Sequence, residues 1–158
     1  MAASKTITSF EKALTLIDAI SQGDEHTLSY SAALQNLGAS KLLNGQIEEG
    51  IAAIEKALPK IMSHGALAEA YIDLCYGYLE LENHEKARQL GEEGLRLAVE
   101  TRQVRNAHYL LGEAAYKLGD IEAAEHHFDT LCRFYPQFRN LKTLLYAIDL
   151  RSMVNLKL

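Results

Sequence analysis

The sequence predicts an all-α fold built from stacked antiparallel helical hairpins, and three observations support this prediction. The 158-residue chain contains only two prolines and is rich in Ala, Leu and Glu, which favour helices. Its 48% hydrophobic content is enough for one compact domain over 1–158. Three stretches also align without gaps at starting points 37 residues apart, which is the pattern of a repeat architecture.

Each aligned stretch is interpreted as a helical hairpin. The stretches are LGASKLLNGQIEEGIAAIEKAL from Leu37, LCYGYLELENHEKARQLGEEGL from Leu74 and LGEAAYKLGDIEAAEHHFDTLC from Leu111. Small residues let antiparallel helices approach closely, while larger ones such as Ile54 and Phe128 fill the space beside the contact. Each stretch has two such small residues, twelve positions apart: Gly38 and Gly50, Cys75 and Ala87, Gly112 and Ala124. One hairpin cannot bury its apolar face alone, so we expect successive hairpins to stack.

A tight turn is expected between the two helices of each hairpin. Asn44 with Gly45, and Gly119 with Asp120, supply a left-handed stop and a following helix cap. The middle hairpin has Glu, Asn and His at the same place, and of these only Asn83 tolerates the left-handed conformation well. We therefore expect Asn83 to make that turn.

One proline interrupts the pattern. Pro59 falls at the end of the second helix of the first hairpin. Proline lacks a backbone N–H and disfavours helix in the residue before it, so it should kink or stop the chain after Leu58.

The three units resemble the tetratricopeptide repeat family. In the third unit the family's signature positions are held by Leu111, Gly112, Gly119, Asp120, Ala124, Phe128 and Pro136, although Leu131 replaces a small residue. The first unit matches at Leu37, Gly38, Gly45, Gly50, Ile54 and Ala57. The second departs most, with Glu82 at the turn glycine and Gly91 at a large apolar position, so looser packing is expected there. The resemblance implies a right-handed α-solenoid of about three repeats.

The repeat register divides the chain into segments. The three repeats are expected at 28–62, 66–101 and 104–136. The same register, extended backwards, predicts an N-terminal half-repeat helix over 8–22 that begins with a capping box at Thr8 and Glu11. A capping helix is predicted over 137–152, where Phe138, Leu141, Leu145 and Ile148 recur at helical spacing, and a tail at 153–158.

Composition and charge argue against several classes of protein. The net charge of -5 disfavours nucleic-acid binding, which needs a basic face. No apolar run reaches the roughly 20 residues of a membrane span, and no signal segment opens the chain, so we expect a cytoplasmic protein without a membrane partner. Cys75 and Cys132 are interpreted as free thiols in structural positions.

The chain lacks the motifs of known catalytic and cofactor sites. It has no glycine-rich phosphate loop, GxSxG, HExxH or paired cysteine motif, so we expect no enzyme and no cofactor. His126 and His127 point about 100° apart on a helix and are interpreted as solvated residues of an outer face, with no metal. Cys132 beside His127 lacks an orienting third group for nucleophilic catalysis.

The family resemblance implies a binding groove lined by the first helices of the hairpins. The corresponding positions are Gln35, Asn36, Ala39 and Leu43, then Ile72, Asp73, Tyr76 and Glu80, then Asn106, Tyr109, Leu110, Glu113, Tyr116 and Lys117. Tyrosine suits binding sites because it offers large contact area at low entropy cost. Helical spacing favours exposure of Tyr76 and Tyr109 in the groove, whereas packing and exposure are equally expected for Tyr116.

Charge predicts what this groove prefers. Some members of the family bind a partner's terminal carboxylate through cationic side chains, but here Asp73 and Glu113 stand in the groove. We therefore expect a protein-interaction adaptor that binds a peptide segment of another protein, basic or aromatic-containing.

The alternative hypothesis is a self-associating scaffold or regulatory segment. Residues 137–158 carry four basic and one acidic residue, a balance of +3, whereas the first 136 residues carry 12 basic and 20 acidic ones, a balance of -8. Val154, Leu156 and Leu158 alternate with polar residues near the end. Three outcomes are predicted for this segment: it folds back on its own chain, it docks into the acidic groove of a neighbouring copy and gives a homo-oligomer, or it is a frayed terminus.

Overall fold

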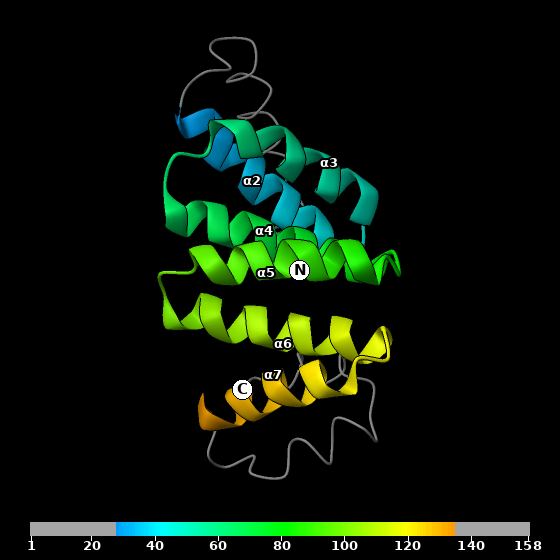
Figure 1. Ribbon diagram of the computed structural model, residues 1–158. Helices are drawn as coiled ribbons and strands as arrows, with labels where there is room; N and C mark the ends of the chain where they lie inside the picture. The colour runs from blue at the N-terminus through cyan, green and yellow to red at the C-terminus, as the bar shows by residue number, and fades with distance from the viewer. Residues whose placement is uncertain (1–27, 135–158) are drawn as a thin grey trace, which may run out of the picture.

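Residues 28–134 are described by the computed structural model, and within them the chain is all-α (Figure 1). The elements are α2 Leu28–Leu43, α3 Ile47–Ala57, the short 3-10 helix η1 Leu58–Lys60, α4 His64–Glu80, α5 His84–Leu97, α6 Thr101–Lys117 and α7 Ile121–Phe134. The prediction of an all-α helical repeat fold is confirmed. The predicted N-terminal helix 8–22, Pro136, the capping helix 137–152 and the tail 153–158 lie outside the described residues.

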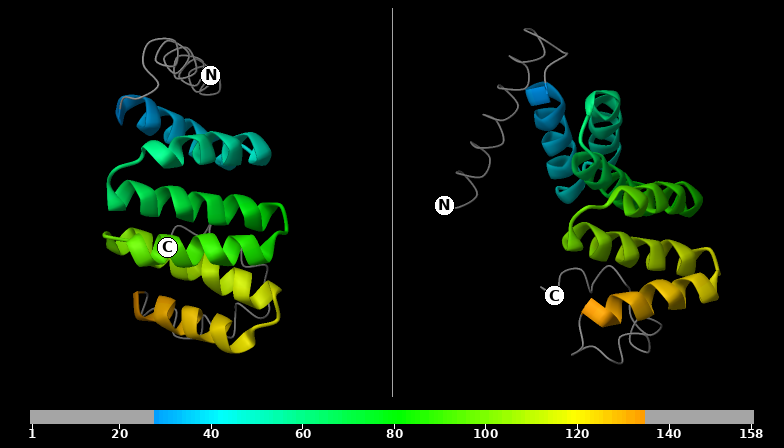
Figure 2. Two further views of the ribbon diagram at one scale, coloured as in Figure 1. Left: turned by 45° about the horizontal axis from the view of Figure 1, so that its top comes forward. Right: turned by 60° about the vertical axis from the view of Figure 1, so that its left-hand side comes forward.

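The helices pair into three hairpins that stack in chain order (Figures 1 and 2). Helix α2 packs on α3, α4 on α5, and α6 on α7. Each hairpin contacts the next through α3 with α4 and α5 with α6, while the first helices α2, α4 and α6 also contact one another in succession. The stacking buries one apolar core that runs from Tyr30 in α2 to Leu131 in α7.

The three turns inside the hairpins share one backbone conformation. Gly45 and Gly119 have φ of 82° and 78°, as expected for the left-handed stop. In the middle hairpin the left-handed residue is Glu82, with φ of 59°, so the expectation for Asn83 is wrong. Asn83 is instead the N-cap of α5, where its side chain accepts a hydrogen bond from the backbone N–H of Lys86 at 3.2 Å. At the N-cap, the side-chain oxygen of Asn83 satisfies one of the unpaired backbone N–H groups at the start of α5. Asn83 has a negative φ of -89° in this position, so it is not the left-handed residue of the turn.

Small residues face large ones across the first and third hairpins, as the sequence predicts. A Cβ at Gly38 would collide with the Ile54 side chain, and a Cβ at Gly112 would collide with the Phe128 ring. Both Ile54 and Phe128 are fully buried. The two glycines therefore set how closely the helices of their hairpins approach.

The middle hairpin reverses this arrangement. Cys75 takes the place of Gly38 and Gly112, and Gly91 takes the place of Ile54 and Phe128. A Cβ at Gly91 would lie 3.0 Å from Cys75 Sγ and 2.8 Å from Leu111 Cδ2. The expectation of looser packing at Gly91 is wrong, because a larger residue on α4 and a leucine from α6 occupy the volume that its side chain leaves.

Local chemistry also ends helix α3 as predicted. The α-helix stops at Ala57 and the chain continues as η1 around Pro59.

Both cysteines are free thiols, Cys75 buried and Cys132 half-buried. Among the described residues, no helix has the length and apolar character that crossing a bilayer would require.

Candidate functional site: the first-helix face

The predicted groove positions lie on α2, α4 and α6, and we call this side of the molecule the first-helix face. Its residues fall into three groups by exposure. Partly exposed are Ala39, Asp73, Tyr76, Glu80, Asn106 and Tyr116, and exposed are Asn36, Leu43 and Lys117. Buried are Gln35, Ile72, Tyr109, Leu110 and Glu113. The accessible part of the face therefore includes Asp73 and Tyr76 of α4 and Asn106 of α6.

Burial corrects the sequence-based prediction at several positions. Tyr109 was expected to be exposed, but only 8% of its surface is. Ile72 and Glu113 are 4% and 1% exposed, so they pack between helices instead of presenting a surface. Adjacent first helices lie close together, so the side chains that face a neighbouring helix are covered by it. Helical spacing within one helix does not predict where that neighbouring helix packs.

Glu113 belongs to the interior between α4 and α6. Burial, and next the nearby Glu113 carboxylate, raise the pKa of the Cys75 thiol far above its usual value. The thiol therefore stays protonated and unreactive at neutral pH. This agrees with the structural role that the sequence suggested for Cys75.

Asp73 has an unusual environment on this face. Burial, followed by the negative charge of Glu69 one turn earlier on α4, raises the pKa of its carboxyl to about 7, although Arg102 acts in the opposite direction. No hydrogen bond or ion pair joins Asp73 to another residue within the described range. Perturbed carboxyls on an accessible face are candidates for functional sites.

Arg102, whose charge acts on Asp73, is itself engaged in an ion pair. Its two terminal nitrogens donate to the two carboxylate oxygens of Glu69 at 2.9 and 3.0 Å. Such a two-point contact fixes both side chains, so it links α6 to α4.

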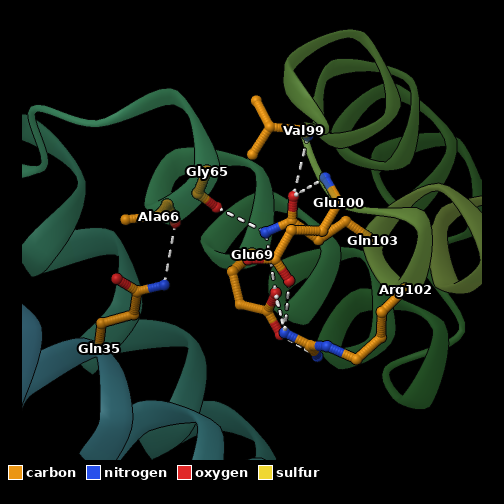
Figure 3. Close-up of polar contacts among 8 residues, drawn as sticks. All are labelled: Gln35, Gly65, Ala66, Glu69, Val99, Glu100, Arg102 and Gln103. Atoms are coloured by element: carbon orange, nitrogen blue, oxygen red, sulfur yellow. Dashed lines mark hydrogen bonds and ion pairs between the residues drawn. The ribbon is translucent and has the colours of Figure 1, made fainter.

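Two glutamines anchor neighbouring hairpins to the first turn of α4 (Figure 3). Gln35 Nε2 of α2 donates to the carbonyl of Ala66 at 3.0 Å, and Gln103 Nε2 of α6 donates to the carbonyl of Gly65 at 2.8 Å. The Oε1 of Gln103 also accepts from the backbone N–H groups of Val99 and Glu100 at 3.0 and 3.3 Å. These bonds position α2 and α6 against α4 and thereby shape the first-helix face.

Glu69, Arg102 and Gln103 were not predicted from the sequence as residues of this face. For Gln103 a signal was present, because Glu100 and Gln103 have the spacing of a helix capping box. For the Glu69 and Arg102 pair no signal exists in one sequence, since the two residues are 33 positions apart.

A histidine pair joins α6 to α7 within the third hairpin. His108 Nδ1 and His127 Nδ1 are 3.0 Å apart, and the ring centroid of His126 lies 5.6 Å from that of His127. His126 is exposed as expected, but His127 is half-buried against His108, so the interpretation of both as solvated is wrong for His127. Burial and the neighbouring histidines lower the pKa of His127 to about 4, and burial lowers the pKa of His108.

The described residues contain no group of three or more His, Cys, Asp or Glu side chains placed to hold a metal ion. The accessible groups of the first-helix face are the carboxyl of Asp73, the rings of Tyr76 and Tyr116, and the amides of Asn36 and Asn106. Aromatic and hydrogen-bonding groups of this kind are common in protein interfaces.

Residues 105–138, which include all of the sequence-defined third hairpin from Leu111, match the tetratricopeptide repeat family. The chain thus contains a tetratricopeptide repeat. The similarity supports a protein-protein interaction module. The matched residues include most of α6 and all of α7, which form the third of the stacked hairpins.

Two comparisons extend this result. The chain is 32% identical over 108 residues to the outer dynein arm-docking complex subunit 4 of Danio rerio; the match covers 65% of this chain and 22% of that protein. The chain thus corresponds to about a fifth of that relative's length. The crystal structure of MamA has a similar fold, with a TM-score of 0.70 at 18% identity over 86% of this chain and 74% of that one.

Proposed function

We propose that the first-helix face binds an extended or helical peptide segment of another protein, and that this segment carries Lys or Arg, with or without aromatic residues. The proposal rests mainly on Asp73, a carboxyl on this face that has no partner within the described residues. The same face also carries the partly exposed Tyr76 of α4 and Asn106 of α6, which supply contact area and hydrogen-bonding groups. In this proposal the chain acts by binding and has no catalytic role.

Charge supports a basic ligand over a terminal carboxylate. Arg102, the cation whose charge acts on Asp73, already pairs with Glu69. A ligand carboxylate would be repelled by Asp73, and the Arg102 guanidinium is already paired with Glu69. A ligand cation, in contrast, would be attracted by the Asp73 carboxylate.

A peptide-binding experiment with charge-reversed variants tests this proposal. The face variant combines Asp73→Lys with Glu80→Lys, both partly exposed on α4. The control variant combines Glu48→Lys with Glu85→Lys, both exposed on the second helices α3 and α5, so its net charge changes by the same amount. Glu113 is left unchanged, because a lysine at that buried position would disturb folding.

The probe is a panel of labelled peptides that differ in Lys, Arg and aromatic content. We expect the peptides bound best by the wild-type protein to be basic, and their affinity to fall at least about tenfold for the face variant but little for the control. Equal affinity for the face and control variants would contradict the proposal.

The alternative function, self-association through 137–158, concerns residues outside the described range and stays a prediction. Light scattering on a chain that lacks 152–158 tests it, since an unchanged mass removes this alternative. The cytoplasmic location expected from the sequence also stays a prediction.

A further inference from the structure

We infer that Asp73 is a proton-linked subsite for a cationic side chain. A Lys or Arg side chain of the bound segment pairs with the ionised Asp73 carboxylate, and the carboxyl releases its proton to solvent as the pair forms. Binding of basic segments would then strengthen as the pH rises through neutrality. This inference rests on the proposed function, because it specifies how the same face recognises its ligand.

Asp73 and Glu69 are neighbours on α4 but differ in their hydrogen-bond partners. Asp73 lies one helical turn after Glu69 on α4, so both carboxyls point to the same side of the helix. Glu69 is satisfied by Arg102 at 2.9 and 3.0 Å and also accepts from Gln103 Nε2 at 3.2 Å. No hydrogen bond or ion pair holds Asp73 within the described residues, although it is only partly exposed. A half-buried carboxyl without a partner is costly, and a ligand cation would remove that cost.

Among the described residues, two charged side chains act on Asp73. They are Glu69 on its own helix and Arg102 on α6, while α2, α3 and α5 contribute no charge that acts on it within the described residues. Glu69 opposes ionisation of Asp73 and Arg102 assists it, but burial dominates and sets the pKa near 7. The carboxyl is therefore about half ionised at neutral pH. A guanidinium or ammonium group placed beside it would lower the pKa and drive the proton off.

This linkage predicts the size of the pH effect. With a pKa of about 7, the ionised fraction is roughly 3% at pH 5.5 and roughly 90% at pH 8. Because only the ionised form binds a cation, the apparent affinity should rise about 30-fold between these values. An uncharged ligand of the same shape should show no such dependence.

The first experiment measures Asp73 itself. NMR titration of the side-chain carboxyl carbon, assigned by comparison with Asp73→Asn, gives the pKa in the intact protein. We expect a value near 7 that falls when N-acetyl-arginine amide is added in millimolar amounts, and that does not fall with N-acetyl-citrulline amide, its neutral analogue. A pKa near 4 without ligand, or the same response to both amides, would overturn the inference.

The second experiment measures affinity against pH. The best arginine-containing peptide of the panel and its citrulline counterpart are titrated between pH 5.5 and 8.5 into the wild-type protein, Asp73→Asn and the control Glu48→Gln. We expect the rise for the arginine peptide in the wild type and in the control, whose substituted carboxylate is exposed on α3. Asp73→Asn should bind the arginine peptide weakly at every pH.

The outcomes separate this inference from the proposed function. If peptides bind the first-helix face with no pH dependence, the proposed function holds and the proton-linked subsite is refuted. If no peptide of the panel binds, the proposed function fails, and the response of the Asp73 pKa to the two amides still decides the subsite.

Discussion

At the scale of single residues, the hairpins are held together by volume matching across each helix pair. The first and third hairpins place a glycine on the first helix against a large residue on the second, whereas the middle one places Cys75 against Gly91. The same interhelical space is filled from the opposite side. The identity of one residue in each pair therefore limits what its partner can be, and volume-conserving exchanges are the ones that cores tolerate.

Gly112→Ala tests this matching. The added methyl group would collide with the Phe128 ring, which is fully buried and cannot move aside, so we expect a loss of stability of about 1 to 3 kcal/mol in chemical denaturation. The double variant with Phe128→Leu should show a smaller loss than the sum of the two single changes.

Gly65→Ala is the matched control. That glycine lies in the first turn of α4, where a Cβ would meet only the exposed Val99 side chain at 3.0 Å. It should be neutral or slightly stabilising, since alanine favours helix. Equal losses for Gly112→Ala and Gly65→Ala would show that helix propensity rather than collision decides.

At the scale of elements, the left-handed turn and the cap of the following helix can be supplied by two different residues, as in the middle hairpin. All three turns need one left-handed residue, supplied by Gly45, Glu82 and Gly119 at equivalent positions of the 37-residue register. In the middle turn Glu82 takes a conformation that is costly for a residue with a side chain, while Asn83 caps α5. The position in the repeat, more than the local residue preference, dictates the backbone there.

The contact between α6 and α7 should depend on pH through the histidine pair. The folded His127 has a pKa of about 4, and the unfolded one has the ordinary value near 6.5. Between these values the unfolded chain binds more protons, so stability is lost as the pH falls from about 6.5 to 4. We expect His127→Gln to reduce this loss in urea unfolding measured at pH 7 and pH 4.5.

His126→Gln is the control, because this neighbouring histidine is exposed. It should keep the wild-type dependence on pH. The comparison is made between variants because Asp73, whose pKa is raised, acts in the opposite direction: its contribution falls as the pH rises from about 4 to 7. The same pH dependence in His127→Gln and the wild type would rule out the pair as the cause.

At the scale of the whole molecule, the stack depends on contacts between successive hairpins. Gln35 and Gln103 join α2 and α6 to the first turn of α4, and Arg102 joins α6 to Glu69. In a stacked repeat protein, stability is approximately a sum of hairpin and interface contributions. Weakening one interface should therefore reduce cooperativity as well as total stability.

Gln103→Ala tests the interface between the second and third hairpins. It removes the donor to Gly65 and the acceptor for Val99 and Glu100, so we expect a loss of about 1 to 3 kcal/mol and a lower denaturant dependence of unfolding. Gln89→Ala, an exposed position on α5, should stay within about 0.5 kcal/mol of the wild type. A Gln103→Ala variant as stable and cooperative as Gln89→Ala would argue against an anchoring role.

The sequence by itself determined the hairpins, because their signals are local or periodic. Gly45 and Gly119 permit left-handed turns, Pro59 ends a helix, and the 37-residue register aligns the small residues that face Ile54 and Phe128. It also placed Asp73 on the first helix of the middle hairpin, where the residue is partly exposed. It failed at Glu82, where position in the repeat overrides residue preference.

Only the tertiary structure decided which residues of that face are accessible. Tyr109 and Glu113 are buried, Asp73 has no hydrogen bond or ion pair to any residue in 28–134, and His127 turns inward to His108. The contacts that fix the face join residues 31 to 38 positions apart, such as Gln35 with Ala66 and Gln103 with Gly65. Helical spacing gives the direction of a side chain from its own helix, but the stacking of the next hairpin determines whether that direction ends in solvent or in protein.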